Sequence, residues 1–145
     1  MDYCFSHFDV GFWTAACESH AYNILGKYLS LDQWIKVKFI YSSNRCLTKF
    51  SLHFGLSSRT ITIKPLRKIW KTQMAKSNGW NRYNTLIIEN TPQTCLQNYG
   101  NAIYVNTYYG SDEDDTLFRL IEYLETFLDC KNVRRYDKRD WLLQF

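Results

Sequence analysis

TLIIENTPQTC, residues 85–95, is the stretch of this 145-residue chain that does most to decide its fold. Its short apolar run, Leu86–Ile88, predicts a buried strand, and Glu89 and Asn90 follow that run directly. A threonine and a proline then break the strand pattern, because proline has no N–H to donate to a sheet. An acid and an amide at the end of a buried strand are candidate ligands for magnesium, which proteins hold through oxygen atoms.

On both sides of this stretch, strands and helices are expected to alternate. Apolar runs or alternation predict strands at residues 9–15, 35–41, 59–64, 86–88 and 102–105. Apolar residues at helical spacing predict helices at residues 18–29, 65–74 and 115–130. This alternation is typical of an α/β domain with a parallel sheet, in which ligands bind beyond the carboxyl ends of the strands.

Four polar residues follow predicted strands and are therefore candidates for a phosphate site: Thr14, Lys64, Glu89 and Asn90. Phosphoryl transfer depends on positioning and on neutralising oxygen charge, which a hydroxyl, a lysine and a metal-binding pair can supply. Simpler interpretations stay open for each. Thr14 could cap the helix that starts near residue 18, Lys64 could be a solvated surface lysine, and the Glu-Asn pair could be turn residues before the proline.

Composition sets further bounds on the class of protein. Hydrophobic residues make up 46% and aromatic residues 17% of the chain, which predicts one compact domain rather than a disordered segment. The net charge of +4 is spread along the chain, and the densest basic run, residues 131–138, is expected to be a solvated face. We therefore expect no nucleic-acid partner. No apolar run approaches the roughly 18 residues that span a bilayer, so no membrane span is expected.

Cysteine and histidine usage gives no sign of a metal or disulfide framework. The five cysteines are odd in number and none form a C-x-x-C pair, which predicts reduced thiols in a cytosolic or nuclear protein. The three histidines, His7, His20 and His53, lack metal-ligand spacing.

Four segments, in order, carry a family resemblance. They are DVGFWTAACESHAYNIL (residues 9–25), ITIKPLRKIW (61–70), TLIIENTPQTCLQNYGNAIYV (85–105), and DEDDTLFRLIEYLETFL (112–128) with the Asn-Val-Arg at 132–134. These segments resemble the second, third and fourth motifs and the closing helix of the CTD phosphatase-like (NLI-interacting-factor-like) family. That family belongs to the haloacid dehalogenase superfamily. The resemblance covers nearly the whole chain.

The resemblance implies one domain over residues 1–145, with a Rossmann-like parallel sheet covered by helices on both faces. It also implies the activity of a magnesium-dependent phosphoserine/phosphothreonine protein phosphatase acting on the RNA polymerase II C-terminal tail. In this family's pattern, Thr14 and Lys64 match the phosphate-binding positions. Glu89 and Asn90 match the metal-binding pair, where the family usually has Asp-Asp or Asp-Asn. The expected partner is a phosphorylated protein.

The family's catalysis begins with a D-x-D-x-T/V motif after its first strand. The first aspartate attacks phosphorus and the second acts as general acid and base. The resemblance puts this motif several dozen residues before Thr14, and only 13 residues precede Thr14 here. We therefore expect the first strand and the nucleophile to be missing, no catalytic residue to be present, and the chain to be inactive alone. The alternative is a non-catalytic, partner-binding scaffold, as in mitochondrial inner-membrane import subunits, so a mitochondrial location stays open.

Residues 112–116, DEDDT, match D-x-D-x-T literally. A nucleophile motif should directly follow an apolar strand, whereas residues 106–111 separate this one from the strand predicted at 102–105. An amphipathic helix follows at once, and acidic residues are stabilising at a helix N-terminus. We therefore interpret the match as the acidic start of that helix.

Overall fold

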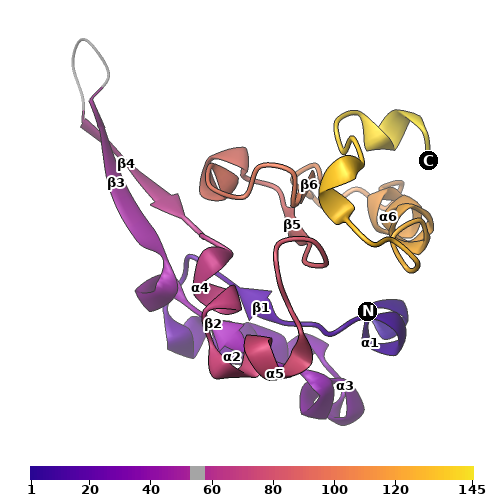
Figure 1. Ribbon diagram of the computed structural model, residues 1–145, viewed down its shortest axis with the longest axis horizontal. Helices are drawn as coiled ribbons and strands as arrows, with labels where there is room; N and C mark the ends of the chain where they lie inside the picture. Colours follow the sequence, from indigo (N-terminus) through magenta and orange to yellow (C-terminus); the bar gives the residue numbers. More distant parts are fainter. Residues whose placement is uncertain (53–57) are drawn as a thin grey trace. The chain divides into compact units, whose positions relative to one another are not determined.

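The computed structural model describes residues 1–52 and 58–145, and Figure 1 shows the order of their helices and strands. The chain divides into two compact units, Met1–Thr48 and Lys49–Phe145, and each is described by itself. The prediction of a single domain over residues 1–145 stays a prediction.

The first unit contains one parallel strand pair with its flanking helices. Its elements are α1 (Asp2–His7), β1 (Phe12–Trp13), α2 (Glu18–Tyr28), α3 (Leu31–Lys36), β2 (Ile40–Tyr41) and the short 3₁₀ turn η1 (Ser43–Arg45). In the pair, Phe12 of β1 lies opposite Ile40 of β2. The predicted helix at 18–29 is confirmed as α2, and the strand predicted at 9–15 is confirmed only over its central two residues.

The strand predicted at residues 35–41 is wrong in its first half, where α3 runs to Lys36. A capping box starts this helix: the Ser30 hydroxyl accepts the Gln33 N–H at 3.2 Å, and the Gln33 side chain accepts the Ser30 N–H at 3.1 Å. Ile35 and Lys36 therefore belong to α3 and not to a half-buried strand, and Ile35 is 74% exposed. Only Ile40–Tyr41 forms the strand.

A close contact fixes the approach to β1. The ring of Phe39 lies so near Gly11 that a Cβ atom there would come within 2.3 Å of a ring carbon. The Phe39 carbonyl also accepts the N–H of Phe12 at 3.0 Å. Only glycine lets the two chain segments approach this closely without moving the ring.

The second unit contains a second parallel pair and most of the buried side chains. Its elements are β3 (Leu47–Leu52, which begins in the first unit), β4 (Ser58–Ile63), α4 (Arg67–Trp70), α5 (Gln73–Asn78), β5 (Ile87–Glu89), η2 (Pro92–Cys95), β6 (Ala102–Tyr104), α6 (Thr116–Glu125), η3 (Val133–Arg135) and η4 (Trp141–Leu143). β5 and β6 are parallel, with Ile88 opposite Ile103. β3 pairs with β4.

The helix predicted at residues 65–74 is instead two short helices, α4 and α5. Thr72 separates them, because its hydroxyl accepts the Ala75 N–H at 3.1 Å and donates to the Ile69 carbonyl at 2.8 Å. A threonine that caps a new helix ends the preceding one. The apolar residues still face inward in part, and Ile69 and Ala75 are buried.

An aromatic cluster packs around Tyr123 of α6. The Tyr123 ring stacks on Trp141 with centroids 5.3 Å apart and meets Phe127 edge-on at 5.1 Å. Burial raises the pKa of Tyr123 to about 12. The helix predicted at 115–130 is confirmed over Thr116–Glu125, although Leu117 on the predicted apolar face is 67% exposed.

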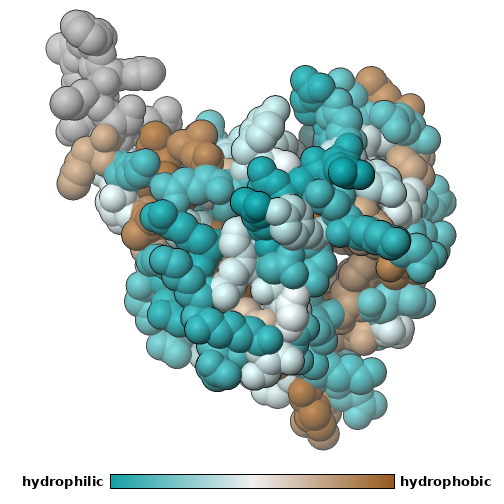
Figure 2. Space-filling model, in the orientation of Figure 1, coloured by the Kyte–Doolittle hydropathy of each residue, from teal (hydrophilic) through white to brown (hydrophobic). Residues whose placement is uncertain are grey.

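The α/β class is confirmed in its coarse form: helices accompany short strands, and two of the strand pairs are parallel. Within residues 1–52 and 58–145, the strands form three separate pairs and no single larger sheet. Figure 2 shows a mainly hydrophilic face on which hydrophobic residues emerge in several separate places. In the part of the chain that the structure describes, no helix has the length and apolar character needed to cross a membrane.

Candidate functional site

Lys64 lies directly after β4, and its main chain is held on both sides. Its N–H donates to the Thr94 carbonyl in η2 at 2.8 Å, and its carbonyl accepts from the Asn98 side chain at 2.6 Å. The Lys64 side chain is only 10% exposed. The interpretation of Lys64 as a solvated surface lysine is therefore wrong, because a buried ammonium needs a partner.

That partner is Glu89, the last residue of β5. The Lys64 ammonium donates a short, direct hydrogen bond to Glu89 Oε2, and the Glu89 side chain is 8% exposed. The other carboxylate oxygen, Oε1, accepts the N–H groups of Asn90 and Thr91 at 3.2 and 3.3 Å. The carboxylate is thus anchored to the turn that follows β5 and neutralised by a lysine from another strand end.

The side chain of Asn98 completes this part of the site, although no sequence pattern pointed to it. Besides donating to the Lys64 carbonyl, it accepts the Leu66 N–H at 3.0 Å, so one amide bridges the two residues that flank Pro65. Asn98 is 1% exposed. Since Pro65 has no N–H of its own, this amide supplies hydrogen bonds that no strand or helix provides there.

Cys95 lies in the same buried region. Its thiol is in hydrogen-bond range of the Thr94 hydroxyl at 3.7 Å, and the residue is 1% exposed. Burial raises the pKa of the Cys95 thiol, and the Glu89 carboxylate also acts in that direction. The thiol is therefore neutral at physiological pH and packs as an apolar group.

Asn90 differs from its neighbour in being exposed. Its side-chain amide donates to the Thr107 hydroxyl at 3.1 Å, and its side-chain oxygen accepts from the Thr91 hydroxyl at 3.3 Å. An amide oxygen has two lone pairs, so one remains for a further ligand.

Thr14 belongs to the first unit, where it directly follows β1. Its N–H donates to the Tyr41 carbonyl at 2.9 Å, and its hydroxyl accepts the Ala16 N–H at 3.0 Å. Thr14 is therefore a turn residue and not the cap of α2, since the residue in the N-cap position is Cys17. An open hollow of about 180 Å³ lies beside it, lined by aromatic and aliphatic side chains, and His20 and Tyr41 are among its lining residues.

The side chains at the end of β5 offer oxygen donors of the kind that magnesium prefers. Magnesium takes one or two protein carboxylates and keeps several waters, and Glu89 with Asn90 provides one carboxylate and one amide oxygen. Across residues 1–52 and 58–145, no group of three or more His, Cys, Asp or Glu side chains is placed to hold a metal; His53 lies outside these residues. The pair fits magnesium in donor type, and Oε2 has a second lone-pair site besides the one that Lys64 occupies.

The acidic run at residues 112–116 lies where it was expected, at the start of α6. Asp115 is in the N-cap position, and the Asp114 carboxylate accepts the Thr116 N–H at 2.9 Å. That interaction with Thr116 lowers the pKa of Asp114. The run follows an irregular segment rather than a strand, as predicted.

Two comparisons with known proteins bear on this site. The family model described as NLI interacting factor-like phosphatase matches residues 1–134, a range that contains both strand ends and all four predicted site residues. Among curated proteins, none matches the chain.

Proposed function

The chain belongs to the NLI interacting factor-like phosphatase family, and we propose that it binds phosphorylated serine or threonine side chains of a partner protein. The family implies a haloacid dehalogenase-like α/β fold and generally uses magnesium. The observation that supports this proposal most is the buried Lys64 ammonium at a strand end, paired with one carboxylate. In a site with little water, such a charge interacts strongly with phosphoryl oxygens.

In the proposed site of the second unit, Lys64 neutralises phosphoryl charge. Thr14 of the first unit is a separate candidate for phosphate binding, by the family resemblance of its segment. Glu89 and Asn90 hold the magnesium ion, which when bound would offset further charge on the phosphoryl oxygens. Asn98 holds the Lys64 backbone in place through the Lys64 carbonyl. The substrate that we propose is the phosphorylated C-terminal tail of RNA polymerase II.

We also propose that residues 1–145 do not hydrolyse phosphate esters by themselves. In the described residues, the positions directly after β1, β2, β4, β5 and β6 are Thr14, Ser42, Lys64, Asn90 and Val105. None of these is an aspartate, and an aspartyl nucleophile is what the family's reaction requires. At the described end of β4, a bound phosphate would meet the Lys64 ammonium, but no aspartate follows a described strand to act as the nucleophile.

The second candidate is a scaffold that binds a partner protein whether or not the partner is phosphorylated. The absence of an aspartate directly after the described strands named above favours it as well. Phosphatase-like members of this family also occur as subunits of the mitochondrial inner-membrane import machinery. The five cysteines are all free thiols, which fits a reducing compartment. We place the protein in the nucleus or cytoplasm, with the mitochondrion as the location under the scaffold role.

Binding of a fluorescent peptide that carries phosphoserine in the polymerase-tail sequence tests the proposal. Fluorescence anisotropy in the presence of Mg²⁺ is expected to show binding that Lys64→Gln weakens at least about tenfold, since a charge-assisted contact is lost. Lys76→Gln is the matched control, because Lys76 is an exposed lysine of α5 in the same unit. Equal binding of the unphosphorylated peptide would contradict phosphate recognition.

A hydrolysis assay tests the proposed lack of turnover, whereas the phosphopeptide assay separates phosphate recognition from a phosphate-independent scaffold. With p-nitrophenyl phosphate and Mg²⁺, the chain is expected to give no turnover above a protein-free blank. Turnover that Lys64→Ala abolishes would show that the chain is an enzyme and would overturn the non-catalytic proposal.

A further inference from the structure

We propose that Lys64 and a divalent cation compete for the Glu89 carboxylate, so that cation binding and phosphate binding at this site favour each other. The inference rests on the proposed function and specifies how the site is regulated. The Lys64 ammonium is bonded to Glu89, and the pair is about nine-tenths buried. While the pair is intact, neither charge is fully available to an external ligand.

The pair is arranged so that one member can leave without disturbing the other. Glu89 is fixed by two backbone N–H groups at Oε1, and these bonds do not involve Lys64. The Lys64 backbone is fixed separately, through Thr94 and Asn98. Only the flexible four-carbon side chain of Lys64 has to move for the ion pair to separate.

The residue next to the buried carboxylate, Asn90, is exposed. It follows Glu89 directly, and Tyr104, which lies opposite Glu89 in β6, is 39% exposed. In the proposal, the cation binds Glu89 at Oε2, where the Lys64 ammonium is bonded, and the Asn90 side-chain oxygen serves as its second protein ligand. Two positive charges against one buried carboxylate repel each other, since little water screens them.

The coupling follows from this arrangement. A cation on Glu89 displaces the Lys64 ammonium, which then gains most by binding a phosphoryl oxygen. A phosphoryl group on Lys64 frees Glu89 for the cation in the same way. Thermodynamic linkage requires the two effects to be equal, and couplings of this kind are about five- to 150-fold in affinity.

Direct titration with Mn²⁺, with free ion followed by its EPR signal, tests the competition without any enzyme assay. Lys64→Met is expected to bind Mn²⁺ at least about fivefold more tightly than the unchanged chain, because the competing ammonium is gone. Lys76→Met, the exposed control from α5, is expected to leave the affinity unchanged. Glu89→Gln is expected to abolish binding. Equal or weaker binding by Lys64→Met would overturn the proposal.

The unchanged chain provides a second measurement that does not depend on whether Lys64→Met folds. O-phosphoserine is expected to tighten Mn²⁺ binding at least about fivefold, after correction for its own complex with Mn²⁺ in a protein-free blank. Absence of that tightening would overturn the inference.

The outcomes also separate this inference from the proposed function. If Lys64→Gln weakens phosphopeptide binding but Lys64→Met leaves the Mn²⁺ affinity unchanged, the proposed function stands and the proposed competition is wrong. If Mn²⁺ binds neither the unchanged chain nor Lys64→Met, the inference fails together with the proposed metal role of Glu89 and Asn90. Phosphate recognition by Lys64 would then stand or fall on the peptide assay alone.

Discussion

The two parallel strand pairs of this chain end in different ways. After β5, Glu89 is buried, anchored by two backbone N–H groups and bonded to Lys64. After β1, Thr14 is half-buried in a local turn, where its hydroxyl accepts the Ala16 N–H beside an open hollow. A strand end can therefore be fixed by a long-range ion pair or by local turn geometry. The strand end that is held by the ion pair should be far more sensitive to substitution.

The largest effect is expected from Glu89→Gln, which keeps the shape of the side chain and removes its charge. The Lys64 ammonium would stay buried without a counter-charge, and breaking a buried pair in this way costs about 3–5 kcal/mol. Urea unfolding followed by circular dichroism measures the change.

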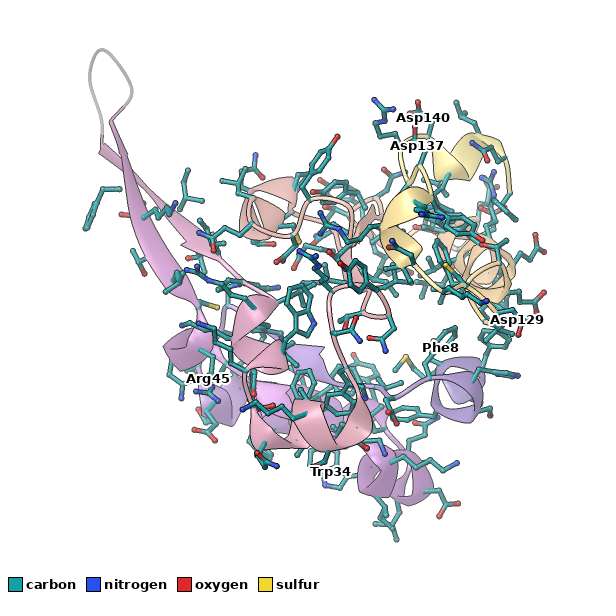
Figure 3. The ribbon with its side chains drawn as sticks, in the orientation of Figure 1. Phe8, Trp34, Arg45, Asp129, Asp137 and Asp140 are labelled. Carbon is teal, nitrogen blue, oxygen red and sulfur yellow. The ribbon has the colours of Figure 1, made fainter. Side chains whose placement is uncertain are left out.

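Its control is Asp137→Asn, which breaks the exposed pair of Asp137 with Arg139. Asp137 is labelled in Figure 3 and lies in the C-terminal segment. No measurable change in the unfolding midpoint is expected, because water screens this pair. A Glu89→Gln variant as stable as Asp137→Asn would show that the ion pair does not hold the β5 end.

Thiol labelling compares the two units next. Cys17, at the N-terminal end of α2, is exposed, and its bond with the Ser19 hydroxyl lowers its pKa, so more of it is thiolate at pH 7. Cys95 is buried and its pKa is raised. Native alkylation by iodoacetamide, followed by peptide mass spectrometry, is expected to modify Cys95 at least about a hundredfold more slowly, because it reacts only after local opening. In 8 M urea, as the control condition, the two rates should converge; native rates that are already similar would contradict the buried site.

Asn98→Ala tests the amide that bridges Lys64 and Leu66. The substitution leaves a buried carbonyl and a buried N–H without partners, and a loss of about 2–3 kcal/mol in the free energy of unfolding is expected. Asn78→Ala is the control, since its bond to the Met74 carbonyl is exposed. Equal losses for the two variants would show that the Asn98 bridge is not special.

Two glycines of the first unit are expected to respond in opposite directions. Gly11→Ala would place a Cβ against the Phe39 ring and should destabilise the unit by about 1–3 kcal/mol. Gly26→Ala meets nothing within 4 Å in α2 and should stabilise it by about 0.5–1 kcal/mol. Thermal unfolding of both variants measures the signs, and a stabilising Gly11→Ala would contradict the close contact.

The smallest effect on stability is expected from Thr14→Val. The variant keeps the side-chain shape, and water can reach the Ala16 N–H once the hydroxyl is gone, so a loss of about 0.5 kcal/mol is expected by urea unfolding. Thr14→Ser, which keeps the hydroxyl, is the matched control. A loss as large as that of Asn98→Ala would show that the two strand ends are held equally strongly.

The elements that the sequence predicted well are those whose apolar pattern is strong and local. Helix α2 and strands β5 and β6 lie where periodicity placed them, within a few residues. The two errors, at residues 35–41 and 65–74, share a physical cause. In each, a polar side chain, Ser30 or Thr72, starts a helix by capping it, and this outweighed the apolar pattern.

For the site, strand-end position identified Lys64 and Glu89 from the sequence, but not the bond between them. β4 and β5 are not neighbours in any sheet of the described residues, so the pairing of their ends depends on how η2 connects them. The burial of the Asn98 side chain could not be predicted from the sequence for a related reason. Asn98 belongs to an irregular segment, where no periodicity separates a buried amide from an exposed one.

The bond from the Leu66 N–H to the Asn98 side chain has a consequence for hydrogen exchange. Leu66 precedes α4, so its amide has no partner within a helix or a sheet ladder and would ordinarily exchange with solvent quickly. Here the acceptor is the Asn98 side chain, and Asn98 is 1% exposed. The Leu66 amide proton should therefore exchange only when its hydrogen bond to Asn98 breaks. Its exchange rate in D₂O then measures how often the end of β4, where Lys64 lies, opens locally.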